Sequence, residues 1–114
     1  MTALTQEQTD LLNKALQYAL DIRIKDAAEY SSSYSTLLMI SEDISAICTI
    51  RTQTFEAIAV EPNNPNIKLM KVIIDILQSA MNADSTTFSL PERQNLLALS
   101  FFVKGVMFAW NNSI

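Results

Sequence analysis

The sequence predicts an all-α protein, an antiparallel four-helix bundle formed as one domain over residues 1–114. A single glycine argues against a β-fold, whose tight turns depend on glycine. Hydrophobic residues make up 49% of the chain, which is enough for one core and too many for a disordered chain. Polar residues recur at helical spacing in four segments, and short breaks between the segments favour antiparallel neighbours.

The first predicted helix runs from about Thr5 to Glu29. Thr5 followed by Gln8 is typical of a capping box, in which each side chain accepts a hydrogen bond from the other residue's backbone amide. On the solvated face, Asp10 and Asp21 each precede a lysine by four positions, the favourable order for a helical ion pair. The solvated face comprises Asp10, Lys14, Gln17, Asp21 and Lys25, and the apolar face comprises Leu12, Ala15, Leu16, Ala19, Ile22 and Ala27.

A serine-rich break over residues 29–36 separates this helix from a second one over Tyr34–Ala59. We expect one serine of the run 31–35 to cap the second helix, because serine hydroxyls readily bond free backbone amides. The apolar stripe of this helix comprises Leu37, Ile40, Ile44, Ile47, Cys48, Phe55 and Ile58.

Two further helices follow, over Ile67–Asn82 and Leu90–Asn112. The loop before the third helix holds two prolines and three asparagines in residues 61–66. The fourth begins with Ser89 as cap, a proline in its first turn and Glu92 at the position that completes a capping box. Its polar face is narrow and consists of Arg93, Ser100, Lys104 and Asn111.

The residue inventory excludes several chemistries. Without histidine, the chain has no Ser-His or Cys-His nucleophile pair and lacks the commonest transition-metal ligand. One cysteine, Cys48, allows neither an internal disulfide nor a cysteine-ligated cluster, and we expect it as a small buried hydrophobic residue. One glycine allows no phosphate-binding loop. We therefore expect no catalytic residues, no cofactor and no metal.

The charge of −4 lies entirely in the first half of the chain. Residues 1–57 carry eight acidic and four basic groups, whereas residues 58–114 carry four of each. Without a basic patch, we expect no nucleic-acid binding. The N-terminal residues lack the pattern of a signal peptide, and the longest apolar stretch, residues 96–110, is too short to cross a bilayer. A cytoplasmic protein is the resulting expectation.

Two arginines lie within apolar stripes. Arg51 follows Ile47 by four residues and precedes Phe55 by four, and Arg23 has a similar setting in the first helix. A buried guanidinium can bind a carboxylate or phosphate ligand through two hydrogen bonds. The alternative, which we favour, is an arginine that extends its head group from the stripe or pairs with an internal acid. In either case we expect the stem of Arg51, and of Arg23, to be mostly buried.

Other polar residues have simpler interpretations. The acidic groups Glu42, Asp43, Glu56 and Glu61 are candidates for acid–base chemistry or a hard metal, but a solvated helix face accounts for them better. Tyr30 and Tyr34 flank the serine run and are expected to cover the rim of the core rather than stack on a ligand.

Small residues share one face of the fourth helix. Ala98, Phe102, Gly105 and Ala109 recur at spacings of four, three and four, and the glycine costs roughly 1 kcal/mol relative to alanine inside a helix. They permit close approach of another helix, either within the chain or in a second copy. Because nearly all of this helix is apolar, we expect a homodimer with its two-fold seam there.

Two function classes follow. The first is a small non-enzymatic interaction protein, such as an adaptor, inhibitor or accessory factor of bacterial or phage type, which acts as a homodimer with an unknown protein partner. The alternative is a helical bundle that binds a small anionic ligand in its core near Arg23 and Arg51. A solid core favours the first class, and a cavity of roughly 300–1,000 Å³ lined by both arginines favours the second.

Overall fold

Four helices make up most of the chain, and the all-α four-helix bundle is confirmed. The computed structural model describes residues 3–112, the structure is 83% helical, and no strand occurs among those residues. The breaks lie where the sequence predicts them. The helices are α1 (Gln6–Glu29), α2 (Tyr34–Ala59), α3 (Asn64–Met81) and α4 (Leu90–Asn112).

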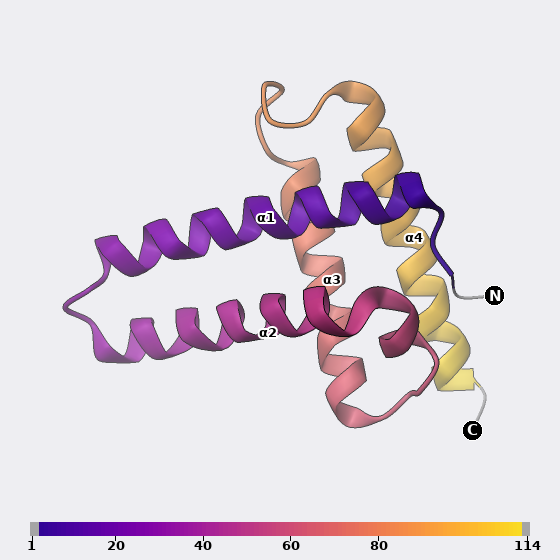
Figure 1. Cartoon of the computed structure of the whole chain (residues 1–114), viewed down its shortest axis with the longest axis horizontal. Helices are drawn as coiled ribbons and strands as arrows, with labels where there is room; N and C mark the ends of the chain where they lie inside the picture. Colours follow the sequence, from indigo (N-terminus) through magenta and orange to yellow (C-terminus); the bar gives the residue numbers. More distant parts are fainter. Residues whose placement is uncertain (1–2, 113–114) are drawn as a thin grey trace.

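The helices form two antiparallel hairpins that cross each other. In Figure 1, α1 and α2 lie side by side, and the pair α3 and α4 runs across them. The core forms at this crossing, where apolar faces of all four helices meet. Each large side chain that becomes fully buried there contributes about 1.5–3 kcal/mol of transfer free energy. The largest fully buried side chains include Leu16, Ile50, Ile58, Met70, Ile73, Leu77, Phe88, Leu96, Leu99 and Val103.

The α1–α2 hairpin continues well beyond the crossing, at the left of Figure 1. We call its distal part, residues 20–44, the arm. Ile40 is the one buried residue between positions 17 and 46, and it lies outside the main core cluster. The arm is therefore a pair of helices with little hydrophobic support of its own.

Both predicted capping boxes are present. The amide of Gln8 donates to Oγ1 of Thr5 at 3.1 Å, and the amide of Thr5 donates to Oε1 of Gln8 at 2.9 Å. At α4, the amide of Ser89 donates to Oε1 of Glu92 at 2.9 Å, and the amide of Glu92 donates to Oγ of Ser89 at 3.3 Å. These local signals determine where α1 and α4 begin.

One helix start differs from the prediction, and one predicted cap lacks its side-chain bond. α3 begins three residues earlier than expected, because Oδ1 of Asn63 accepts from the amide of Asn66 at 2.9 Å and Pro65 fits into the first turn. At α2 the cap residue is Ser33, but its side chain makes no capping bond and instead donates to Thr36 at 2.9 Å.

Near its C-terminal end α2 has a kink that the sequence does not reveal. Thr54 has φ 67° and ψ 155°, a conformation that is strained for a β-branched residue. Its hydroxyl accepts from the amide of Ala57 at 3.4 Å, so that it caps the short helical segment that follows. The kink turns Phe55 and Ile58 into the core, where both are buried.

Two expectations for helix faces are wrong. Lys14 does not pair with Asp10 and instead bonds Glu92 of α4 at 2.8 Å, because the helix crossing brings that carboxylate closer. Ser100, expected on the polar face of the fourth helix, is only 1% exposed. Packing selects the side of α4 that contains Leu96, Leu99 and Val103, and Ser100 lies on that side.

Candidate interaction surfaces

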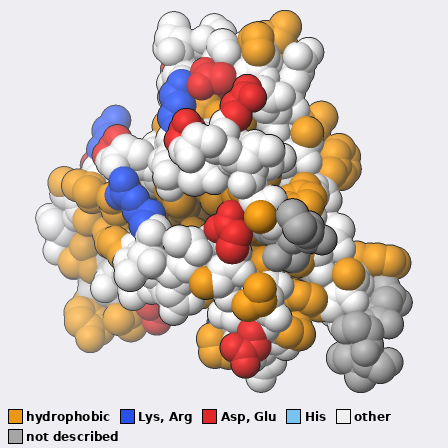
Figure 2. Space-filling view, turned by 45° about the vertical axis from the view of Figure 1, so that its right-hand side comes forward, with side chains coloured by type: hydrophobic (Ala, Val, Ile, Leu, Met, Phe, Trp, Pro, Cys, Tyr) orange, Lys and Arg blue, Asp and Glu red, His pale blue; other side chains and the backbone are white. Residues whose placement is uncertain are grey.

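Large apolar side chains that remain exposed gather in two places. One is the outer side of α4, and in Figure 2, where the right-hand side of Figure 1 comes forward, several separate hydrophobic groups lie along the right-hand edge. The other is the arm. In α4 they are Leu90, Leu97, Phe101 and Phe108; in the arm they are Ile22, Ile24, Tyr30, Tyr34, Leu38 and Met39.

The exposed side chains of α4 form one continuous stripe. Leu90, Leu97, Phe101 and Phe108 are 68%, 46%, 62% and 70% exposed. Their spacings of seven, four and seven residues keep them on one side of a helix, as in a coiled-coil seam. We call this stripe, together with the exposed small residues Ala98, Gly105 and Ala109, the α4 outer face.

The glycine of this face has no packing role within the chain. A Cβ atom built on Gly105 meets no heavy atom within 4 Å. Close packing inside one chain therefore does not explain the glycine. Of the four residues predicted as the dimer seam, Ala98, Gly105 and Ala109 are exposed, whereas Phe102 is half-buried with its ring 6.0 Å from that of Phe55.

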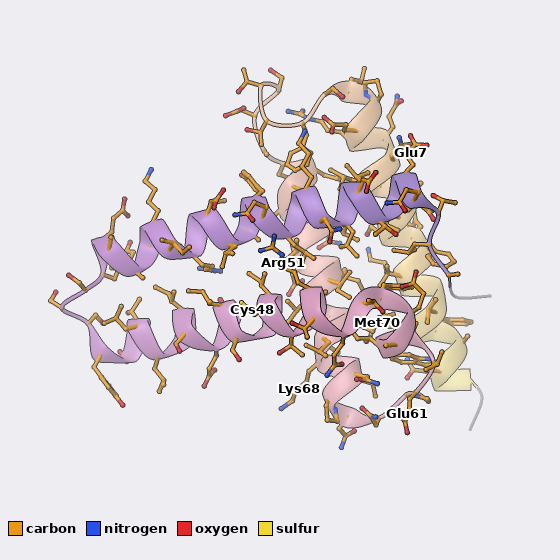
Figure 3. The ribbon with its side chains drawn as sticks, in the orientation of Figure 1. Glu7, Cys48, Arg51, Glu61, Lys68 and Met70 are labelled. Atoms are coloured by element: carbon orange, nitrogen blue, oxygen red, sulfur yellow. The ribbon has the colours of Figure 1, made fainter. Side chains whose placement is uncertain are left out.

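The two candidate arginines lie apart and are more exposed than expected. Arg23 is half-exposed and forms ion pairs with Asp26 at 3.2 Å and with Asp43 at 3.1 Å. Arg51 is exposed, and its guanidinium donates to Oε1 of Gln17 at 3.0 Å. Figure 3 shows Arg51 reaching from α2 toward α1. The expected burial of the Arg51 stem is not found, because the side chain extends to the exposed Gln17 of α1 instead of entering the core.

No common cavity joins the two arginines. Arg23 lines a hollow of ≈ 200 Å³ between α1, α2 and α3, and Arg51 lines a different hollow of ≈ 130 Å³. Both volumes lie below the roughly 300–1,000 Å³ typical of sites for small molecules. Arg23 is also compensated by two carboxylates. This geometry gives little support to an anionic ligand held by both residues.

The remaining polar candidates are scattered. Glu42 and Glu61 are exposed, Asp43 pairs with Arg23, and Glu56 accepts from the amide of Leu4 at 3.0 Å. Among residues 3–112, no three acidic or cysteine side chains come together in a way that could hold a metal ion. Cys48 is exposed rather than buried, because the side of α2 that carries Ile47 and Ile50 packs into the core and Cys48 lies on another side of the helix.

The two carboxyl groups with shifted pKa values serve local structure. Hydrogen bonds from the side chains and amides of Thr86 and Thr87 lower the pKa of Asp84, which organises the loop before α4. The hydrogen bond from Lys14, followed by that from the amide of Ser89, lowers the pKa of Glu92. A general acid needs the opposite shift, so neither group is tuned for that role.

None of the helices described is long and apolar enough to cross a membrane. Comparison with known proteins adds no assignment, since no protein-family model, no curated protein and no solved structure matches the chain.

Proposed function

We propose that the chain is a non-enzymatic protein–protein interaction protein that forms a homodimer through the α4 outer face and presents its acidic first half to a partner. It needs no cofactor and acts in the cytoplasm. The observation that carries the proposal is the exposure of Leu90, Leu97 and Phe101 on one side of α4, at 68%, 46% and 62%. Beside them lies Gly105, where an added Cβ atom would meet no heavy atom within 4 Å.

The size of this stripe suits a dimer. A large aromatic side chain has about 150–250 Å² of surface. The summed exposed area of Leu90, Leu97, Phe101 and Phe108 is therefore roughly 500 Å². The largest apolar patches on monomers are about 300–600 Å² and are often functional. A standard interface buries about 800 Å² per partner, and the small and polar residues beside the stripe supply the difference.

The sequence order along the stripe also favours self-pairing. With an antiparallel two-fold axis at the level of Val103, Phe101 of one copy lies level with Gly105 of the other. Phe108 is then level with Ala98, and Leu97 with Ala109. Three of the four large side chains therefore meet a small one, which is the condition for close helix packing. The contact is isologous, as in most soluble dimers.

The charge distribution points the same way. Lys104 is the one ionisable residue on the outer side of α4 between positions 94 and 112, and its ammonium lies 5.7 Å from the ring centre of Phe101. The charge excess lies in the first half of the chain. Two copies can therefore meet through α4 with little repulsion, since few like charges are brought together.

Static light scattering at micromolar concentration tests the dimer. We expect a dimeric mass for the natural chain and a monomeric mass for Gly105→Leu, because leucine at this position separates the two helices. The same substitution should raise the stability of each chain by about 0.8 kcal/mol, since leucine favours a helix more than glycine does.

The matched control is Ala28→Leu, an equally exposed small residue of α1. It should leave the dimer unchanged. A monomeric natural chain would refute the dimer, and a Gly105→Leu variant that is still dimeric would refute this seam.

A further inference from the structure

A groove lies at the base of the arm, where the α1–α2 hairpin crosses α3. Its volume is ≈ 200 Å³. Its apolar lining comes from all three helices and includes Ile22, Ile47, Val72 and Ile76. Asp43 of α2 and Asp75 of α3 also line it. An apolar cleft bordered by acidic groups suits a side chain with an aliphatic stem and a cationic end.

The charges around this groove sum to a negative value. Arg23 is the cation that lines it, and this residue is already paired with Asp26 and Asp43. Asp75 is exposed and makes no ion pair among the described residues, and Lys71, one turn earlier on α3, is not bonded to it. Asp75 therefore offers an uncompensated carboxylate beside an apolar wall.

The apolar surface continues from the groove onto the arm. Met39 lies one turn before Asp43 on α2 and is 67% exposed. Tyr30 lies one turn after Asp26 and is 51% exposed. The arm also carries five acidic groups against two basic ones. A ligand that covers this track needs apolar and basic groups at regular spacing along about three turns of helix.

We propose that the groove and the adjacent side of the arm bind a basic amphipathic helix of a partner protein. A lysine or arginine of that helix lays its stem on Ile47, Val72 and Ile76 and places its charge at Asp75. Apolar residues of the same helix cover Met39 and Ile22. This inference rests on the proposed function and names the chemistry of its partner.

The size and charge of the site argue for this occupant over others. The groove is smaller than the roughly 300 Å³ lower limit of small-molecule sites but can admit one side chain. Nucleic acids and anionic lipid surfaces are repelled by the excess of acidic groups on the arm. A second copy of the arm carries the same charges and is repelled too.

Titration of the ¹⁵N-labelled chain with a synthetic 18-residue helical peptide of leucine and lysine tests the inference by NMR. We expect the largest amide shifts around Ile22, Ile47 and Val72. Asp75→Asn should weaken binding about tenfold. Ser79→Leu, which fills the exposed rim of the groove, should weaken it as much.

The matched control is Glu7→Gln, which removes one exposed carboxylate at the opposite end of α1 (Figure 3). It should change the affinity less than twofold. Three outcomes would each overturn the inference. They are equal losses of affinity in Asp75→Asn and Glu7→Gln, amide shifts centred on α4, and equally tight binding of a leucine–glutamate peptide. Light scattering on the same samples reports the dimer separately, so a failed groove is distinguishable from a failed dimer.

Discussion

The α4 outer face and the arm both expose large apolar side chains, yet they differ in charge and in support. The α4 outer face carries one lysine in its central part, whereas the arm carries five acidic and two basic groups. The core side of α4 carries Leu96, Leu99 and Val103, each at most 1% exposed. The arm contains one buried residue, Ile40.

This difference separates two kinds of recognition. An apolar stripe with one lysine on a well-supported helix can meet its own copy, because few like charges oppose the contact and little order is lost. An acidic and weakly supported hairpin repels its own copy and gains most from a basic partner that also stabilises it.

The packing beneath the two surfaces can be compared by truncating one buried side chain in each region to alanine. We expect Leu99→Ala to lower the free energy of unfolding by 2–5 kcal/mol, because it opens a cavity at the helix crossing. Ile40→Ala should cost about 2 kcal/mol, the low end of that range, since fewer side chains surround it. Urea unfolding measures both values. An Ile40→Ala cost above that of Leu99→Ala would show that the arm has its own firm core.

A charge placed on each surface separates their roles. Phe101→Glu should weaken dimerisation at least about 100-fold, or roughly 3 kcal/mol, because two glutamates would be desolvated in one seam. Met39→Glu on the arm should leave the dimer constant unchanged. Sedimentation equilibrium gives both constants. If Met39→Glu dissociates the dimer and Phe101→Glu does not, the assignments of the two surfaces must be exchanged.

The kink of α2 marks where the arm-bearing helix joins the core. Thr54→Gly should raise stability by about 1 kcal/mol, because glycine adopts a positive φ freely and retains most of the capping value. Gln53→Gly, its neighbour with helical geometry, should instead lose about 0.5 kcal/mol. Thermal or urea unfolding distinguishes the two. A loss in both variants would mean that Thr54 is not strained.

The smallest effect concerns pH and the contact between α1 and α4. The pKa of Glu92 is lowered in the folded chain, chiefly by Lys14, so the folded state favours the ionised form. This contribution is complete above the ordinary pKa of a glutamate and is lost as the pH falls through the lowered value. Near pH 7, Glu92→Gln should therefore be less stable than the natural chain. Between pH 5 and pH 3, the natural chain should lose more stability than the variant does.

Unfolding curves recorded across that range check the sign. Glu7→Gln is again the control, since its carboxylate is exposed and has no partner among the described residues. Parallel pH curves for the natural chain and Glu92→Gln would contradict the contribution of the Lys14–Glu92 pair.

Local signals in the sequence were sufficient for the four helices. Capping residues and polar spacing act within one or two turns, so the starts of α1 and α4 could be predicted to the residue. The kink at Thr54 could not, because no proline or glycine marks it. Two threonines before it bond backwards to the carbonyls of Ser45 and Cys48 at 2.9 and 2.8 Å, a weak signal of helix bending that is easily missed.

The fold class, the helix ends that are set by caps, the acidic character of the first half and the lack of histidine chemistry all follow from the amino-acid sequence. The side of each helix that faces the core depends instead on how the four helices pack. α4 is apolar nearly all round, so its pattern cannot distinguish Phe101, which is exposed, from Phe102, which packs on Phe55. Arg23 and Asp75 belong to different hairpins, and only the crossing of those hairpins brings them to one groove. The periodicity of apolar residues depends on one helix at a time, whereas a site between helices depends on how those helices pack together.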